Sequence, residues 1–185
     1  MFLTLGVKAG TISQGQMWAI LPQTWLGNLV GSVFVALLYS WGGGSLLPVD
    51  TSIVHSVALA KTTAPATVLF FKGALCNWLV CLAIWMAIRT EGAAKFIAIW
   101  WCLLAFIASG YEHSVANMTL FALSWFGHHS EAYTLAGIGH NLLWVTLGNT
   151  LSGVVFMGLG YWYATPKSER PAPAKINQTE ATANN

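Results

Sequence analysis

"FIASGYEHSVANM", residues 106–118, places Glu112 and His113 side by side inside a long apolar stretch of the chain. An ionisable side chain at mid-membrane costs about 2.5 to 3.5 kcal/mol on insertion scales, so such residues usually line a polar path or meet a partner. Ser109 and Gly110 stand just before the pair, and Gly/Ser pairs are typical places for a helix to break. The stretch therefore predicts two half-helices whose polar residues gather at the break.

The composition is that of an integral membrane protein. Of the 185 residues 56% are apolar and only 8% are charged, whereas about a quarter are charged in an ordinary soluble domain. The net charge of +2 is too small and too scattered for the basic surface that nucleic-acid binding requires, so nucleic acid is excluded as a partner. The cysteines Cys76, Cys81 and Cys102 lie in apolar runs without metal-binding spacing, which indicates packing residues and no metal or other cofactor.

The apolar segments predict an all-α bundle, because a helix needs about twenty mainly apolar residues to cross a bilayer. The predicted spans are 17–40, 65–88, 96–122 and 142–164, the third of them broken. Residues 1–164 thus form one transmembrane domain. The segments 41–64 and 123–141 are predicted loops, and the Pro-, Ala- and Asn-rich residues 165–185 are a predicted disordered tail.

The distribution of Lys and Arg predicts the orientation of the chain, since positive charges are retained on the cytoplasmic side. Given the predicted spans, one side carries Lys8, Arg89, Lys95, Lys167, Arg170 and Lys175. The other side carries only Lys61. Both termini are therefore expected in the cytoplasm.

An internal repeat links the first and fourth predicted spans. "LGNLVGSVFVALLYSW" begins at Leu26 and "LGNTLSGVVFMGLGYW" begins at Leu147. Similar helices of opposite direction are what a duplicated unit with inverted topology leaves, and many transport proteins carry substrate between such halves. By the same repeat, the leading "MFLTLGVKA" is predicted to be the second half of another broken helix. We therefore expect the chain to be the C-terminal two-thirds of a six-span protein.

The break itself is the first candidate site. The N-terminal end of a helix attracts anions, and an imidazole beside it can donate a hydrogen bond or a proton. If the second half-helix starts near Gly110, helical spacing places Phe106, Gly110, His113 and Asn117 near one face, as a narrow gate. The alternative is that His113 merely closes the broken helix, with Glu112 turned to a lipid headgroup or to Lys61.

Other polar residues allow two interpretations each. Lys61 could concentrate anions at a pore mouth, or it could be an ordinary solvated lysine. Asn28 and Asn149 are interpreted as contacts between helices, while the role of Asn77 stays open, as does that of Lys72.

A second class of function is a membrane subunit that holds haem or a metal. Its candidate ligands are His113, His128, His129, Glu131 and His140. A histidine pair in a loop lacks the i, i+4 helical spacing of a metal site, so this signal is weak.

The strings "SGYEHSVANM", "LCNWLVCLAIW" and the paired "GNLVG" and "GNTLSG" resemble the formate/nitrite transporter family over residues 1–165. The resemblance implies an aquaporin-like fold of six spans with inverted repeats, a homo-pentamer in the bacterial inner membrane, and no enzymatic activity. It implies passage of nitrite, formate or hydrosulfide past a central histidine. The residues implied in the substrate pathway are His113, Lys61, Glu112, Asn117, Asn77 and Phe106.

The resemblance also implies a mechanism for these residues. Lys61 attracts the anion, and His113 donates a hydrogen bond or proton so that the anion crosses the apolar constriction with its charge reduced. A bare charge is costly in a low dielectric, so neutralisation is physically reasonable.

We predict that the 185-residue chain by itself forms no closed, selective pore, because the expected facing half of the pore wall is not among its predicted spans. Efflux of nitrite from liposomes that hold only this chain is the measurement. Flux at the rate of a six-span relative would contradict the prediction.

Overall fold

The computed structural model of the chain describes residues 1–44, 52–127 and 129–170. Within these ranges every regular element is helical. The elements are α1 (Phe2–Lys8), α2 (Gln14–Tyr39), the π-helical η1 (Ser40–Gly44), α3 (Ile53–Thr62), α4 (Ala66–Ala87), α5 (Ala93–Ala108), α6 (Ser114–Phe126), α7 (Leu135–Leu151), the π-helical η3 (Ser152–Leu159), α8 (Gly160–Ala164) and the 3-10 turn η4 (Lys167–Glu169). The prediction of an all-α fold is confirmed.

Three of the predicted spans are single long helices. The helices long and apolar enough to cross a membrane are Gln14–Gly44, Ala66–Ala87 and Leu135–Ala164. The third predicted span is divided into the shorter apolar helices α5 and α6. The expected bundle with a broken third span and a leading half-helix, α1, is therefore confirmed.

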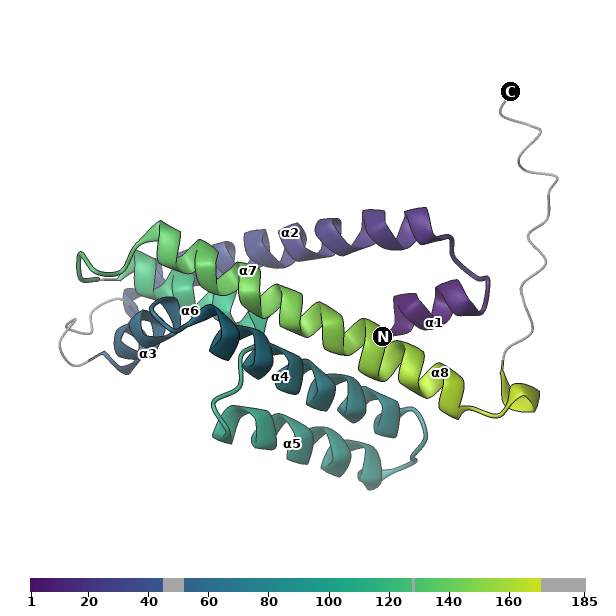
Figure 1. Ribbon diagram of the computed structural model, residues 1–185. Coiled ribbons are helices and arrows are strands. Elements are labelled where there is room, and N and C mark those ends of the chain that lie inside the picture. Colours follow the sequence, from purple (N-terminus) through teal and green to yellow (C-terminus); the bar gives the residue numbers. More distant parts are fainter. Residues whose placement is uncertain (45–51, 128, 171–185) are drawn as a thin grey trace.

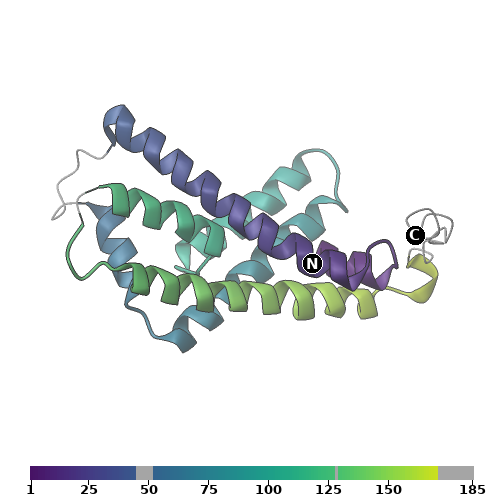
Figure 2. The same cartoon turned by 90° about the horizontal axis from the view of Figure 1, so that it is seen from above.

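The long helices form a layered bundle. In Figure 1, α2 and the continuous α7–η3–α8 helix run in opposite directions, as the inverted repeat predicts, and α4 lies between α7 and α5. Figure 2 shows that α2 is inclined to the α7–η3–α8 helix when the bundle is viewed from above. The half-helix α1 packs against η3.

Helices α4 and α7 pack closely together, and glycines permit their approach. A Cβ at Gly148 would collide with the carbonyl oxygen of Phe70 and lie 2.9 Å from the amide nitrogen of Ala74. On the other side, a Cβ at Gly73 would lie 2.8 Å from the carbonyl oxygen of Val145. The two backbones are thus in contact because neither residue carries a side chain.

The break begins with a Schellman motif at the end of α5. Gly110 has a φ of +63°, the left-handed conformation that glycine adopts freely. Its amide donates to the carbonyl of Ile107, and the amide of Tyr111 donates to that of Phe106, which is the Schellman pattern. The next helix, α6, begins only at Ser114, with His113 in extended conformation as its N-cap. The condition that the second half-helix starts near Gly110 is therefore not met, because residues 111–113 belong to no helix.

Both predicted loops contain helical residues and are shorter than the sequence indicated. Segment 41–64 contains α3, which starts after the N-cap Ser52, and Lys61 lies in the last turn of this helix. Segment 123–141 contains the end of α6 and the first turns of α7, which starts after the N-cap Thr134. The hydroxyl of each N-cap accepts a hydrogen bond from a backbone amide of its helix. Such a cap is a local signal for the start of a helix, and a hydrophobicity pattern does not reveal it.

The segments that carry most positive charges gather at one end of the bundle. The end of α1, the turn between α4 and α5, and α8 with η4 lie at this end in Figure 1, whereas α3 lies at the other. Lys8, Arg89, Lys95, Lys167 and Arg170 belong to or adjoin the former segments, and Lys61 belongs to α3. Lys175 and most of the predicted tail lie outside the described residues.

We predict that Gly148→Ala lowers the free energy of unfolding by about 1 to 3 kcal/mol, the typical cost of overpacking, because the methyl group forces α4 away from α7. Thermal unfolding of the chain in detergent measures the effect. The matched control is Gly139→Ala on the same helix, where a Cβ would meet nothing within 4 Å in the described structure. An equal loss of stability in both variants would contradict the packing argument.

Candidate functional site

A partly buried ion pair joins α3 to the break between α5 and α6. The Lys61 Nζ lies 2.7 Å from the Glu112 Oε1, and the side chains are 18% and 5% exposed. Glu112 is therefore turned toward Lys61, as one of the alternatives drawn from the sequence had it. Removing either member of such a pair leaves an uncompensated charge, which typically costs about 3 to 5 kcal/mol.

Two buried asparagines complete a polar ring around this pair. The Asn117 amide donates to the Glu112 Oε2 at 2.6 Å and to the Asn141 Oδ1 at 2.9 Å. The Asn141 amide in turn donates to the Lys61 backbone carbonyl at 2.9 Å. We call Lys61, Glu112, Asn117 and Asn141 the polar ring. Asn117 is therefore turned into the ring, toward Glu112 and Asn141, whereas helical spacing had placed it beside His113 in the gate.

Asn149 of α7 holds the break together. Its amide donates to the carbonyls of Gly73 at 2.8 Å and Glu112 at 3.1 Å, and its Oδ1 accepts the amide of Ser114 at 3.0 Å. The Asn77 amide donates to the backbone carbonyl of Asn149 at 2.6 Å. The interpretation of Asn149 as a contact between helices is confirmed.

Asn28, the counterpart of Asn149 in the sequence repeat, behaves differently. Its amide donates to the carbonyl of Thr24 within α2 at 2.9 Å, so the interpretation of Asn28 as a contact between helices was wrong for the described structure. The reason lies in the surroundings: backbone groups of α4 and of the break reach the side chain of Asn149, whereas the described bond of the Asn28 side chain stays within α2.

His113 caps α6 and lies near Phe106. Its Nδ1 accepts the amide of Ala116 at 3.3 Å, so in the neutral ring the proton resides on Nε2. The ring centroids of Phe106 and His113 are 6.2 Å apart, which brings the two residues of the expected gate together. The amides of Ser114 and Ala116 are occupied by Asn149 and His113, so the start of α6 offers an anion fewer amides than the sequence suggested.

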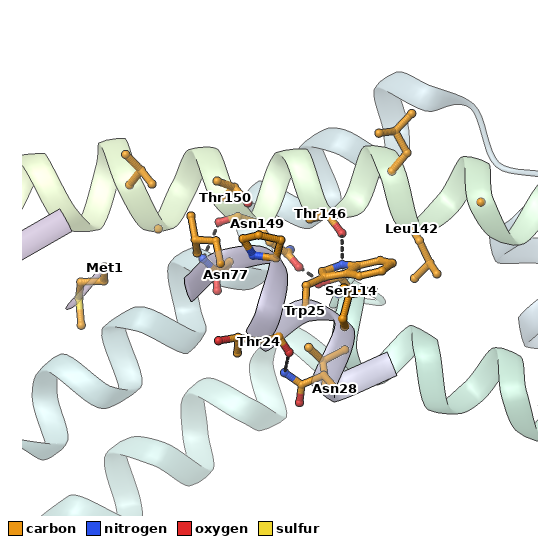
Figure 3. A pocket seen from close by; sticks show the side chains of 18 residues that line it. Met1, Thr24, Trp25, Asn28, Asn77, Ser114, Leu142, Thr146, Asn149 and Thr150 are labelled. Carbon is orange, nitrogen blue, oxygen red and sulfur yellow. Dashed lines mark hydrogen bonds between the residues drawn. The ribbon is translucent and has the colours of Figure 1, made fainter. Parts of the chain in front are cut away.

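A largely apolar cavity of ≈ 760 Å³ lies between α2 and the α7–η3 helix (Figure 3). Its wall includes Trp25, Asn77, Ser114, Thr146 and Asn149. In Figure 3 the Trp25 indole reaches across to α7, where its Nε1 donates to the Thr146 hydroxyl at 3.1 Å. Among the residues expected in the substrate pathway, Asn77 alone lines this cavity. The cavity therefore touches the break but not the polar ring.

The candidate metal ligands have other partners. His129 stacks on Trp125 at 4.7 Å between ring centroids, and the His140 Nε2 lies 3.1 Å from the carbonyl oxygen of Ala64. In the described ranges no three His, Cys, Asp or Glu side chains come together as a metal site would need. His128 lies outside the described residues. Nothing in this arrangement favours the haem or metal alternative.

We predict that Asn149→Leu lowers the free energy of unfolding by about 2 to 6 kcal/mol, because it leaves two backbone groups at the break, the Glu112 carbonyl and the Ser114 amide, without partners, at roughly 1 to 3 kcal/mol each. Thermal unfolding in detergent and the exchange rate of the Ser114 amide are the measurements. Asn28→Leu is the control, since it removes one bond within α2. The argument fails if the two variants lose equal stability.

Comparison with known proteins places these features in a family. The family model described as "Formate/nitrite transporter" matches residues 1–163. The nitrite transporter NirC of Salmonella typhimurium is 97% identical over the whole chain, which covers 69% of that protein. NirC of Escherichia coli is 91% identical over 99% of this chain and 68% of its own length.

Solved structures agree with this match. An "FNT family ion channel" is 98% identical, with a TM-score of 0.87 over 90% of this chain and 67% of the other. A "Pentameric formate channel with formate bound" is 25% identical, with a TM-score of 0.70 over 84% of this chain and 69% of the other. The relatives are named as transporters and channels, not enzymes. The chain therefore belongs to the formate/nitrite transporter family.

Proposed function

We propose that the chain contributes the path by which small monovalent anions, nitrite foremost, cross the bacterial inner membrane. The observation that carries the proposal is the position of His113, beside Phe106 at a braced break in a membrane span, in a chain 97% identical to a named nitrite transporter. The structural similarity to a formate channel supports formate as a further substrate.

His113 is the proposed contact of the anion at the narrowest point. Because its Nδ1 is occupied by the amide of Ala116, its Nε2–H is the group left to donate a hydrogen bond or a proton. An anion without such a donor meets a large desolvation cost in an apolar constriction. The nearby ring of Phe106 supplies the apolar side of the gate, and the histidine supplies the polar side.

Lys61 is the proposed first contact of the anion. Its charge is balanced by Glu112 at 2.7 Å, so it acts as a local hydrogen-bond donor more than as an isolated positive charge. The remaining exposure of the Lys61 side chain, 18%, leaves room for an anion to reach it. Asn117 is proposed to orient Glu112, and Asn77 to support the wall through Asn149.

The exposed surface and the relatives support a proposal for the assembly. Large apolar side chains are exposed on α2 and α5, among them Trp18, Phe34, Phe96, Trp100 and Trp101. Such side chains require lipid or neighbouring subunits around the bundle. We propose a homo-pentamer, in keeping with the name of the related formate channel. The positive end of the bundle, and with it the C-terminus, is proposed to face the cytoplasm.

We predict that His113→Ala lowers the nitrite flux by about tenfold to a hundredfold, as expected when a hydrogen bond to a charged group is lost. The protein, expressed from its whole reading frame, is reconstituted in liposomes and nitrite uptake is measured. His129→Ala is the matched control, because His129 is exposed and stacks on Trp125. Unchanged flux in His113→Ala, at equal amounts of protein, would falsify the proposed role of the histidine.

A further inference from the structure

The last turn of α3, which carries Lys61, is held by the first turns of α7. The final carbonyls of a helix have no partner within it. Two side chains of α7 provide partners for carbonyls at or just after the end of α3. The Asn141 amide donates to the carbonyl of Lys61 at 2.9 Å, and the adjacent His140 Nε2 lies 3.1 Å from that of Ala64. Gly137 admits this approach, since a Cβ there would lie 3.0 Å from the Cβ of Thr62.

The orientation of the Asn141 amide is determined by the chemistry of its neighbours. The Glu112 carboxylate and the Lys61 carbonyl can only accept hydrogen bonds. The NH₂ group of Asn117 must therefore face Glu112, and that of Asn141 must face Lys61. The Asn141 oxygen is then left to accept from Asn117, at 2.9 Å. Only an amide of this length, donating at one end and accepting at the other, links these partners.

Asn141 therefore fixes Lys61 from two directions. One bond holds the backbone of Lys61 directly. The other holds Asn117, which orients the carboxylate that the Lys61 ammonium contacts. Asn141 is 0% exposed and Asn117 is 2% exposed, so water does not substitute for these bonds.

We propose that Asn141 is the positioning residue of Lys61, setting where the ammonium meets an incoming anion without touching the anion itself. The inference rests on the proposed function, because it assigns to Lys61 the first contact with the substrate. Loss of Asn141 therefore weakens binding of the anion at Lys61 and leaves its passage past His113 unchanged.

Two variants test the inference in the protein expressed from its whole reading frame. Asn141→Leu has a similar volume and removes both bonds, and Asn141→Ser keeps a polar group that is too short to bridge both partners. With nitrite as the probe, we expect the half-saturating concentration to rise about three- to tenfold, the factor that one hydrogen bond is typically worth. The maximal rate stays near that of the wild type, which separates binding from passage.

The control variant is Tyr133→Phe. It removes one buried hydrogen bond, from the Tyr133 hydroxyl to the carbonyl of Phe121 at 3.0 Å, and Tyr133 has no bond to the polar ring among the described residues. A general loss of packing would alter this variant as well, whereas the inference expects its half-saturating concentration to be unchanged. In a Lys61→Met background, Asn141→Leu is expected to cause no further rise.

The possible outcomes separate the inference from the proposed function. Wild-type protein without nitrite flux overturns both. A normal half-saturating concentration in both Asn141 variants, with a raised one in Lys61→Met, overturns the inference alone. So does failure of both Asn141 variants to fold while Tyr133→Phe folds, since the role of Asn141 is then structural.

Discussion

The fold depends on satisfying the backbone of residues 109–113 without water. A bilayer interior offers no hydrogen-bond partners, so a non-helical segment at that depth must be bonded by the protein. The Schellman motif at Gly110 closes α5, and the side chain of Asn149 bonds both Glu112 and Ser114 at the start of α6. The uninterrupted α7 is thus the brace that permits α5 and α6 to be interrupted.

The same helix organises the polar ring two turns earlier. Asn141 and Asn149 are both buried on α7, and between them Val145 and Gly148 are buried as well, which defines the face turned to α4 and α6. One asparagine braces the break and the other bonds the end of α3. The position of Glu112 is consequently determined by α7 at its backbone, through Asn149, and at its carboxylate, through Asn141 and Asn117.

Much of the architecture could be predicted from the sequence, because apolar length and a Ser-Gly break are local signals. The start of α6 could not be placed, since the non-helical residues 111–113 depend on the bonds that Asn149 supplies to Glu112 and Ser114. The helix α3 was missed because ten residues are too few to span a membrane. Asn141 was missed for another reason: its partners are far away in the chain, and no spacing in the sequence links it to Lys61.

The repeated segments show that similar sequence need not have similar surroundings. Gly148 touches the backbone of α4, whereas a Cβ at its counterpart Gly27 would meet no atom within 4 Å in the described structure. Asn149 bonds α4 and the break, while Asn28 bonds its own helix. A glycine beside an asparagine gives each helix a small, polar docking face. On α7 that face is filled by α4 and the break, and on α2 it borders the cavity, so the packing partner and not the motif determines what each asparagine does.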